Sequence, residues 1–125
     1  MLFRSGRPDL AREHATRWNA VVMLKGAPTV IASPDGRLRI NPTGNAGMAT
    51  GGTGDVLTGI LASYLGRGLD PFDAASLAAY VHGLAGDLAR DDVGEEGLVA
   101  GDLVTYLPSA TRRLEAELMP KGPCP

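Results

Sequence analysis

The sequence of 125 residues is poor in the residues that crosslink small proteins. It has one cysteine, Cys124, which has no partner for an internal disulfide. Its two histidines, His14 and His82, lie far apart, so we expect no structural zinc site. The sequence also lacks an apolar run of about 18 residues that could span a bilayer, and its first residues do not resemble a secretory signal. We therefore expect a cytoplasmic protein without a membrane partner.

An excess of either charge is missing as well. The chain has twelve Lys and Arg residues and 14 Asp and Glu residues, and the formal net charge of -2 argues against a nucleic-acid partner. Hydrophobic residues make up 44% of the chain, which is close to the average for a globular domain. The 17 glycines and nine prolines follow no repeating period, so they indicate functional loops and not a collagen-like chain.

The first 40 residues carry one helical pattern and three strand patterns. Apolar residues at spacings of three and four predict a helix over 8–18. The apolar run Ala20–Leu24 predicts a strand buried on both faces, of the kind found in parallel α/β sheets. Residues 29–32 and 37–40 predict two more strands, which the turn residues Ser33–Gly36 join into a hairpin.

Helices are expected in the rest of the chain. A glycine-rich loop over 41–55 leads into an amphipathic helix over 56–65, which Gly66 or Gly68 ends. A second helix is expected over 70–89, followed by an acidic loop at 91–97. A last helix is expected over 102–118, with Asp102 as its N-cap and Pro108 as a kink. This order of elements predicts a layered α/β domain.

The segment Gly51-Gly52-Thr53-Gly54-Asp55 is the most informative for function. Its glycines let the backbone approach a ligand, and consecutive amides at the start of a helix can hold a phosphate. A carboxylate would be out of place in a loop that only binds phosphate, because it repels the ligand. Its presence is explained if Asp55 is a base that takes a proton from an attacking hydroxyl. The alternative is that Asp55 only caps the helix and that the glycines form a tight turn.

A longer part of the sequence resembles a known family. The segment Asn41–Ile60 is similar to the signature of the ADP-dependent NAD(P)H-hydrate dehydratases, which are repair enzymes with a ribokinase-like fold. Val22–Thr29 matches the Lys-Gly-x-x-Thr turn that binds nucleotide in that family, and Tyr80–Asp87 and Gly101–Leu103 are also similar to it. The resemblance covers residues 9–118 and implies a ribokinase-like α/β fold, of which this chain looks like the C-terminal half.

The resemblance also implies a site. Asp55 would be the catalytic base that contacts the hydrated NAD(P)H substrate, with ADP as co-substrate and Mg²⁺ as the phosphate partner. The sequence shows no dedicated metal cage, which agrees with Mg²⁺ held by phosphates and water. The implied reaction phosphorylates the substrate's hydroxyl and then loses phosphate, which restores NADH or NADPH and leaves AMP. The residues expected to bind the nucleotide are Lys25, Gly26, Ala27, Pro28, Thr29, Asn45, Gly52, Thr53 and Gly54.

One departure from the family limits the expectation. A His-Pro-Gly-Glu-like segment, which belongs to the N-terminal half of the family's domain, has no counterpart here. We therefore expect residues 1–119 to be the C-terminal part of a dehydratase domain, residues 120–125 to be a disordered tail, and the chain alone to be weakly active or inactive. Unpaired sheet edges also favour association into a homo-oligomer.

Two other functions stay open. A small-molecule kinase of the ribokinase superfamily would use the same phosphate cradle and base, but would release a phosphorylated alcohol. A truncated remnant would bind adenine nucleotide, or only self-associate, without turnover. Among single residues, we expect Trp18 to lie in the core and His82 to be a packed, hydrogen-bonded histidine, whereas Asn41, Thr43 and Asn45 fit either a ligand contact or local backbone bonds.

Overall fold

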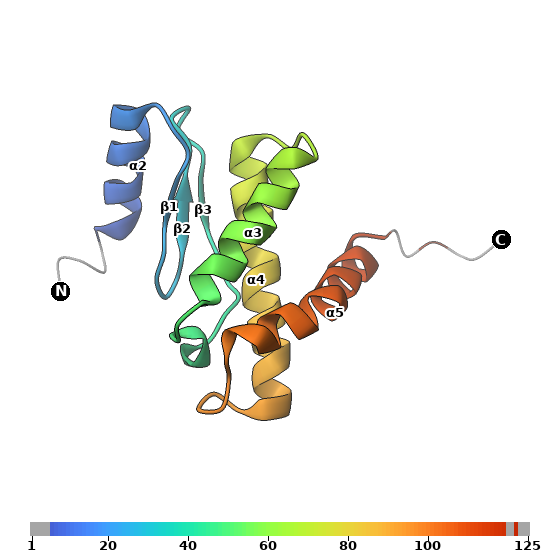
Figure 1. The fold of residues 1–125 in the computed structure, drawn as a ribbon. Coiled ribbons are helices and arrows are strands. Elements are labelled where there is room, and N and C mark those ends of the chain that lie inside the picture. The colour runs from blue at the N-terminus through green and yellow to red at the C-terminus, as the bar shows by residue number, and fades with distance from the viewer. Residues whose placement is uncertain (1–5, 120–121, 123–125) are drawn as a thin grey trace.

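The structure is a computed structural model that describes residues 6–119 and 122. It has three layers: a helix, a small β-sheet and a group of helices on the other face of the sheet (Figure 1). The elements in chain order are α2 (Arg7–Trp18), β1 (Val22–Leu24), β2 (Val30–Ala32), β3 (Leu38–Ile40), the 3-10 helix η1 (Ala46–Met48), α3 (Thr53–Gly66), α4 (Pro71–Val93) and α5 (Ala100–Leu118). The α/β expectation is confirmed.

The sheet has the order β1-β2-β3, and both of its pairings are antiparallel. Side chains of a strand alternate between the two faces, so the central strand β2 contacts both helical layers. Val30 and Ala32 pack with Ala11 of α2, whereas Ile31 packs with Phe72 of α4. Because all three residues of β2 are buried, this strand joins the layers into one core.

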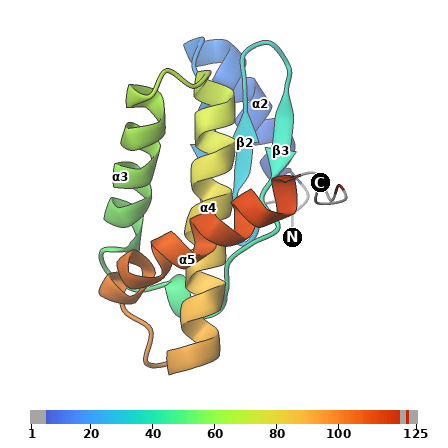
Figure 2. The ribbon, with the colours of Figure 1, turned by 90° about the vertical axis from the view of Figure 1, so that its right-hand side faces the viewer.

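Small residues let the glycine-rich loop approach α4 closely. A Cβ placed on Gly83 would lie 2.7 Å from the backbone carbonyl carbon of Thr43, and one on Gly86 would lie 2.8 Å from Cγ of Met48. Larger residues at these two positions would push the loop away from the helix. Helix α5, which follows α4 in the chain, crosses it (Figure 2). Leu103 and Ala110 of α5 are fully buried.

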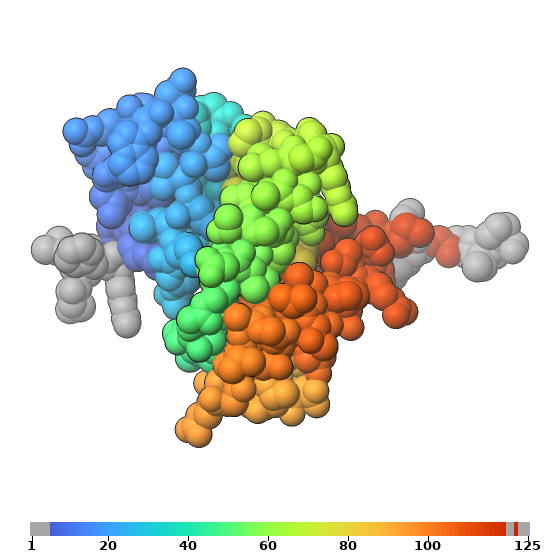
Figure 3. All heavy atoms as spheres, in the orientation of Figure 1, coloured from blue at the N-terminus to red at the C-terminus, as the bar shows by residue number. Residues whose placement is uncertain are grey.

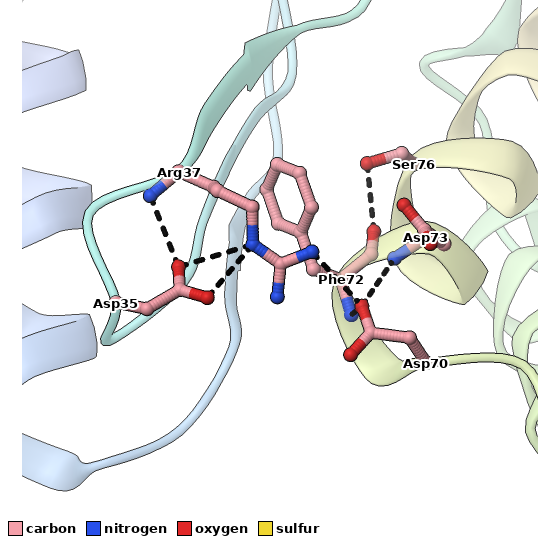
Figure 4. Close-up of polar contacts among 6 residues, drawn as sticks. All are labelled: Asp35, Arg37, Asp70, Phe72, Asp73 and Ser76. Atoms are coloured by element: carbon pink, nitrogen blue, oxygen red, sulfur yellow. Dashed lines mark hydrogen bonds and ion pairs between the residues drawn. The ribbon is translucent and has the colours of Figure 1, made fainter.

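The hairpin between β2 and β3 is tied to the start of α4. The Arg37 guanidinium lies 2.8 Å from the Asp35 carboxylate and 3.2 Å from that of Asp70, and 4.7 Å from the centre of the Phe72 ring (Figure 4). The Asp70 carboxylate also accepts hydrogen bonds from the amides of Phe72 and Asp73, and so caps α4 as expected for an aspartate before Pro71. These contacts fix the end of the sheet that is far from the glycine-rich loop.

The structure corrects the expectation for the strand at 20–24. This strand is shorter, Val22–Leu24, and its residues are only half-buried because β1 pairs with a single neighbour among the described strands. The fully buried strand is β2, and the pairing is antiparallel, not parallel. An apolar sequence therefore indicated a strand correctly but not its place within the sheet.

The helix boundaries at 89 and 102 were also wrong. Helix α4 continues through the acidic segment to Val93, because no helix breaker occurs before Gly94, which adopts a left-handed φ of 78°. The Tyr106 hydroxyl donates a hydrogen bond to Asp92 in this extension. Helix α5 begins at Ala100, so Asp102 lies in its first turn and accepts from the Val99 amide at 2.8 Å instead of being the N-cap.

The expectation that Trp18 is a core residue is wrong. The buried contacts of α2 are made by Ala11 and Ala15, whereas Trp18, in the last turn, packs edge-on against His14 and stays 60% exposed. The end of α3 at Gly66 is confirmed. Pro108 lies inside α5, which continues through it. The expected tail at 120–125 falls outside the described residues, except for Gly122.

Within the ranges that the structure describes, no helix combines the length and the apolar character needed to cross a membrane. In the space-filling view, α3 lies on the surface between the N-terminal part of the chain and α5 (Figure 3). The first turn of α3 is therefore accessible from solvent, and its residues 54 and 55 are half-buried and exposed, respectively.

Candidate functional site

A cleft of about 780 Å³ lies between the β1–β2 loop and the glycine-rich loop. One wall is the whole of Lys25–Thr29, and the other consists of residues 41–46, 48–51 and 53. Ala79, His82 and Gly83 of α4 also line it. The two segments that carry the family resemblance, separate in the sequence, therefore face each other across one cleft.

The Lys25–Thr29 wall is held by hydrogen bonds to its own backbone. The Thr29 hydroxyl donates to the Gly26 carbonyl at 3.2 Å and lies 3.3 Å from the Gly26 amide, which can donate to it. Arg7, at the start of α2, donates from its guanidinium to the carbonyls of Lys25 and Pro28 at 2.9 and 2.7 Å. The hydroxyl of Thr29 thus shapes the loop.

The opposite wall ends in the first turn of α3. Gly52 precedes this helix with a φ of 91°, a conformation that favours glycine. The first bond that closes the helix runs from the Val56 amide to the Gly52 carbonyl at 3.2 Å. Among residues 6–119, the amides of Thr53, Gly54 and Asp55 make no hydrogen bond of good distance and angle, although the turn at 51–52 brings this stretch back toward Thr50. These three donors lie at the positive end of the helix dipole.

The Lys25 side chain crosses the cleft to this turn. A Cβ placed on Gly54 would lie 2.6 Å from Nζ of Lys25, so the ammonium group rests directly on the glycine. The ion pairs found among residues 6–119 do not include Lys25. An ammonium beside the N-terminus of a helix places two positive groups together, which is unfavourable unless an anion joins them. The arrangement is therefore suited to an anionic ligand.

His82 supports the same turn from α4. Its Nε2 lies 2.8 Å from the Thr53 carbonyl, so this nitrogen carries the proton and donates it to that oxygen. Burial lowers the pKa of the His82 imidazole below 6.5; the bond to Thr53 opposes this shift, and the positive charge of Lys25 reinforces it. The side chain is 8% exposed. The expectation of a packed, hydrogen-bonded histidine is confirmed.

Asn45 and Thr53 line the cleft, but their side chains are engaged within the protein. The Asn45 amide oxygen accepts from the Gly47 amide at 3.0 Å, and its nitrogen donates to Asp87 at 2.9 Å. The Thr53 hydroxyl lies 2.9 Å from the Met48 carbonyl. Both side chains therefore fix the shape of the glycine-rich loop, and the Thr53 backbone amide is the group left for a ligand.

Asp55 is exposed in the first turn of α3, next to Gly54. The residue that caps this helix is Gly52, and no side chain caps it by a hydrogen bond. The structure therefore contradicts the alternative that Asp55 is the cap of this helix. Asp55 follows Gly54 in the same turn of the helix, and it is not among the residues that line the cleft.

The structure brings together most of the residues predicted from the sequence. Lys25, Gly26, Ala27, Pro28, Thr29, Asn45 and Thr53 line the cleft, and Gly54 contacts the Lys25 ammonium, whereas Gly52 and Asp55 are not among the lining residues. Sequence reasoning missed Arg7 and the role of Asp87. No local signal could have found Arg7, because it precedes its partner Pro28 by 21 residues.

Comparison with known proteins identifies the family. A family profile described as NAD(P)H-hydrate dehydratase matches residues 3–109. The chain belongs to this family. It is 55% identical over 112 residues to the bifunctional NAD(P)H-hydrate repair enzyme of Moorella thermoacetica, and 42% identical over 109 residues to the ADP-dependent (S)-NAD(P)H-hydrate dehydratase of Bacillus subtilis. The expected family is thereby confirmed.

Solved structures agree with this assignment. The ADP/ATP-dependent NAD(P)H-hydrate dehydratase of Bacillus subtilis, co-crystallised with ATP and Mg²⁺, matches with a TM-score of 0.84 and 40% identity over 89% of this chain. A ribokinase-like superfamily protein from Enterococcus faecalis matches with a TM-score of 0.68 and 30% identity over 82% of this chain. The ribokinase-like fold class is confirmed.

The match is to part of each relative. This chain covers 40% of the Bacillus subtilis structure and 21% of the Moorella thermoacetica enzyme. The matched part includes the cleft, the Lys25 loop and the first turn of α3.

Proposed function

We propose that this chain forms the nucleotide-binding cleft of an ADP-dependent NAD(P)H-hydrate dehydratase and supplies its catalytic base. The observation that carries the proposal is the Lys25 ammonium, which meets the first turn of α3 without an acidic partner among residues 6–119. The diphosphate of ADP is an anion of the size and chemistry that an ammonium group and several free amides bind together. The names of the relatives, which are ADP-dependent dehydratases, support the same substrate pair.

In this proposal the residues have distinct roles. The amides of Thr53, Gly54 and Asp55 hold phosphate oxygens, and the Lys25 ammonium neutralises their charge. The Asp55 carboxylate takes the proton of the substrate's hydroxyl while the oxygen of that hydroxyl forms a bond to the β-phosphorus of ADP. The bond from that phosphorus to AMP breaks, and AMP leaves with the electron pair. Phosphate then leaves the carbon with the C–O electron pair, and loss of a proton from the adjacent carbon restores NADH or NADPH.

Mg²⁺ fits this site as a companion of the nucleotide. No cluster of three His, Cys, Asp or Glu side chains that could cage a metal occurs in the described ranges. A cation that keeps its waters and binds phosphate oxygens needs no such cage. When bound, it would offset the negative charge of the phosphates.

A transplant tests the proposed function. We would replace the matching segment of the Bacillus subtilis dehydratase with this chain and assay hydrated NADH with ADP. We expect the absorbance of reduced nicotinamide to return, with AMP and phosphate as co-products. A folded hybrid that binds ADP but transfers phosphate to an alcohol, leaving a stable phosphoester, would support the kinase instead. The isolated chain is expected to bind ADP with little or no turnover.

We propose in addition that the chain self-associates. Strands β1 and β3 each pair on one side only among the described strands, and such edges favour association. Ile40 on β3 is 54% exposed. Light scattering at micromolar concentration measures the mass in solution: a dimer or larger species is expected, and a monomer would contradict the proposal.

A further inference from the structure

The side chain of Arg7 connects α2 to the β1–β2 loop. Its Nη1 donates to the Pro28 carbonyl at 2.7 Å, and its Nη2 donates to the carbonyls of Leu24 and Lys25 at 3.1 and 2.9 Å. One guanidinium thus binds three backbone oxygens, one at the end of β1 and two in the Lys25–Thr29 wall of the cleft. No carboxylate of residues 6–119 pairs with Arg7, so the bonds fix backbone geometry and are not an ion pair.

The loop is shaped to receive this guanidinium. A Cβ placed on Gly26 would lie 2.8 Å from Cζ of Arg7, so the group occupies the space where any other residue would carry its side chain. A guanidinium holds its donors in a fixed planar fork, so it binds several carbonyls at once with less loss of conformational freedom than a flexible ammonium group. The Thr29 hydroxyl closes the loop from its other end through Gly26. Arg7 and Thr29 together hold the loop in one conformation.

This contact bears directly on Lys25. The carbonyl of Lys25 is bonded to Arg7, while its ammonium rests on Gly54 at the start of α3. In the free protein that position is electrostatically unfavourable for an ammonium, because the helix N-terminus is also positive. A lysine on a mobile loop would move its charge out into water. Fixing its backbone keeps the charge where an anionic ligand needs it.

We propose that Arg7 is a positioning residue of the phosphate site and that it acts through Lys25. This proposal rests on the proposed function, because it takes the anion bound by Lys25 to be the diphosphate of ADP. Arg7 itself does not contact the phosphates. Its effect is to preorganise the loop, so that little conformational freedom is lost when the nucleotide binds.

A double-mutant cycle tests the proposal. ADP affinity is measured by calorimetry for the wild-type chain, Arg7→Ala, Lys25→Ala and the double variant, with Arg12→Ala as the matched control. Arg12 is an exposed arginine on the same helix. We expect Arg7→Ala to weaken ADP binding about tenfold and Arg12→Ala to leave it unchanged. The double variant should bind ADP at most about twofold more weakly than Lys25→Ala does, because Arg7 is proposed to act only through the Lys25 side chain.

Other outcomes separate the two proposals. A folded Arg7→Ala variant with wild-type affinity overturns the role of Arg7, as does a double variant whose loss is the full product of the two single losses. If Arg7→Ala does not fold, as judged by circular dichroism, the cycle is run with Arg7→Lys, for which we expect an intermediate affinity. A folded wild-type chain that does not bind ADP overturns the proposed function, and with it the site that Arg7 is proposed to serve.

Discussion

The two ends of the three-stranded sheet carry opposite electrostatic arrangements. At the hairpin end, Arg37 lies between the carboxylates of Asp35 and Asp70, so these three charges are paired with one another (Figure 4). At the cleft end, the Lys25 ammonium rests on Gly54 without an acidic partner among residues 6–119, beside the positive terminus of α3. At the first end, the charges of Arg37, Asp35 and Asp70 offset one another, whereas at the second end the charge of Lys25 is available for a ligand. This difference is the main evidence for the proposed anion site.

The hairpin end depends more on burial than on charge. Arg37 and Asp70 are close to half exposed, and exposed ion pairs contribute little to stability. The Phe72 ring between them is 2% exposed and packs with Ile31 in the core. The guanidinium of Arg39 also lies 5.4 Å from the ring centre. We infer that the ring, and not the ion pairs, holds the hairpin to α4.

The largest expected effect follows from this inference. Phe72→Ala should lower the free energy of unfolding by about 3–5 kcal/mol, because it removes a buried ring and leaves a cavity. Chemical denaturation measures this change. The affinity for ADP per folded molecule should stay within about threefold of wild type, since the two ends of the sheet act independently. A folded variant that has lost ADP binding would show that the ends are coupled.

The next effect concerns the chemistry at the cleft end. In the Bacillus subtilis hybrid, Asp55→Asn should reduce dehydratase turnover at least about 100-fold, because the base is lost, while ADP affinity changes little. Steady-state kinetics and calorimetry give the two values. The matched control is Asp73→Asn, an exposed first-turn residue of α4 at the other end of the sheet. Undiminished turnover in folded Asp55→Asn would exclude this carboxylate as the base.

A smaller effect is expected from His82. Burial lowers its pKa, so below about pH 6.5 the unfolded chain takes up a proton that the folded chain does not. The stability that the neutral imidazole contributes is therefore present above pH 6.5 and is lost as the pH falls through the pKa of the folded state. Thermal unfolding between pH 5 and 8 should show this loss, and His82→Gln should remove it. His14→Gln, a substitution away from the cleft, should keep it; a pH profile unchanged in His82→Gln contradicts the assignment.

The sequence predicted the parts of the fold that depend on local patterns. The turn at Ser33–Gly36, the cap at Asp70 and the end of α3 at Gly66 all rest on residues whose own backbone preferences set the structure. The place of the 20–24 strand at a sheet edge and the exposure of Trp18 depend on which elements pack beside them. Such contacts are not encoded in a local pattern.

The same division holds for the site. The segment Gly51–Asp55 was found from its glycines and carboxylate, and Lys25–Thr29 from the family resemblance; the structure places Lys25–Thr29, Gly51 and Thr53 at one cleft. The roles of Arg7 and Asp87 came only from three-dimensional contacts, with the loop at 24–28 and with Asn45. The sequence therefore indicated which segments line the cleft better than which groups hold them in place.

The most direct test of the account compares ADP with adenosine on the wild-type chain and on Lys25→Ala by calorimetry. If the open charge at the cleft binds phosphate, ADP should bind the wild type at least about tenfold more tightly than adenosine does, and Lys25→Ala should remove most of that difference. The ADP affinity of the wild type should also fall as salt is added. Equal affinities for ADP and adenosine in the wild type, or a difference that survives in folded Lys25→Ala, would contradict the account.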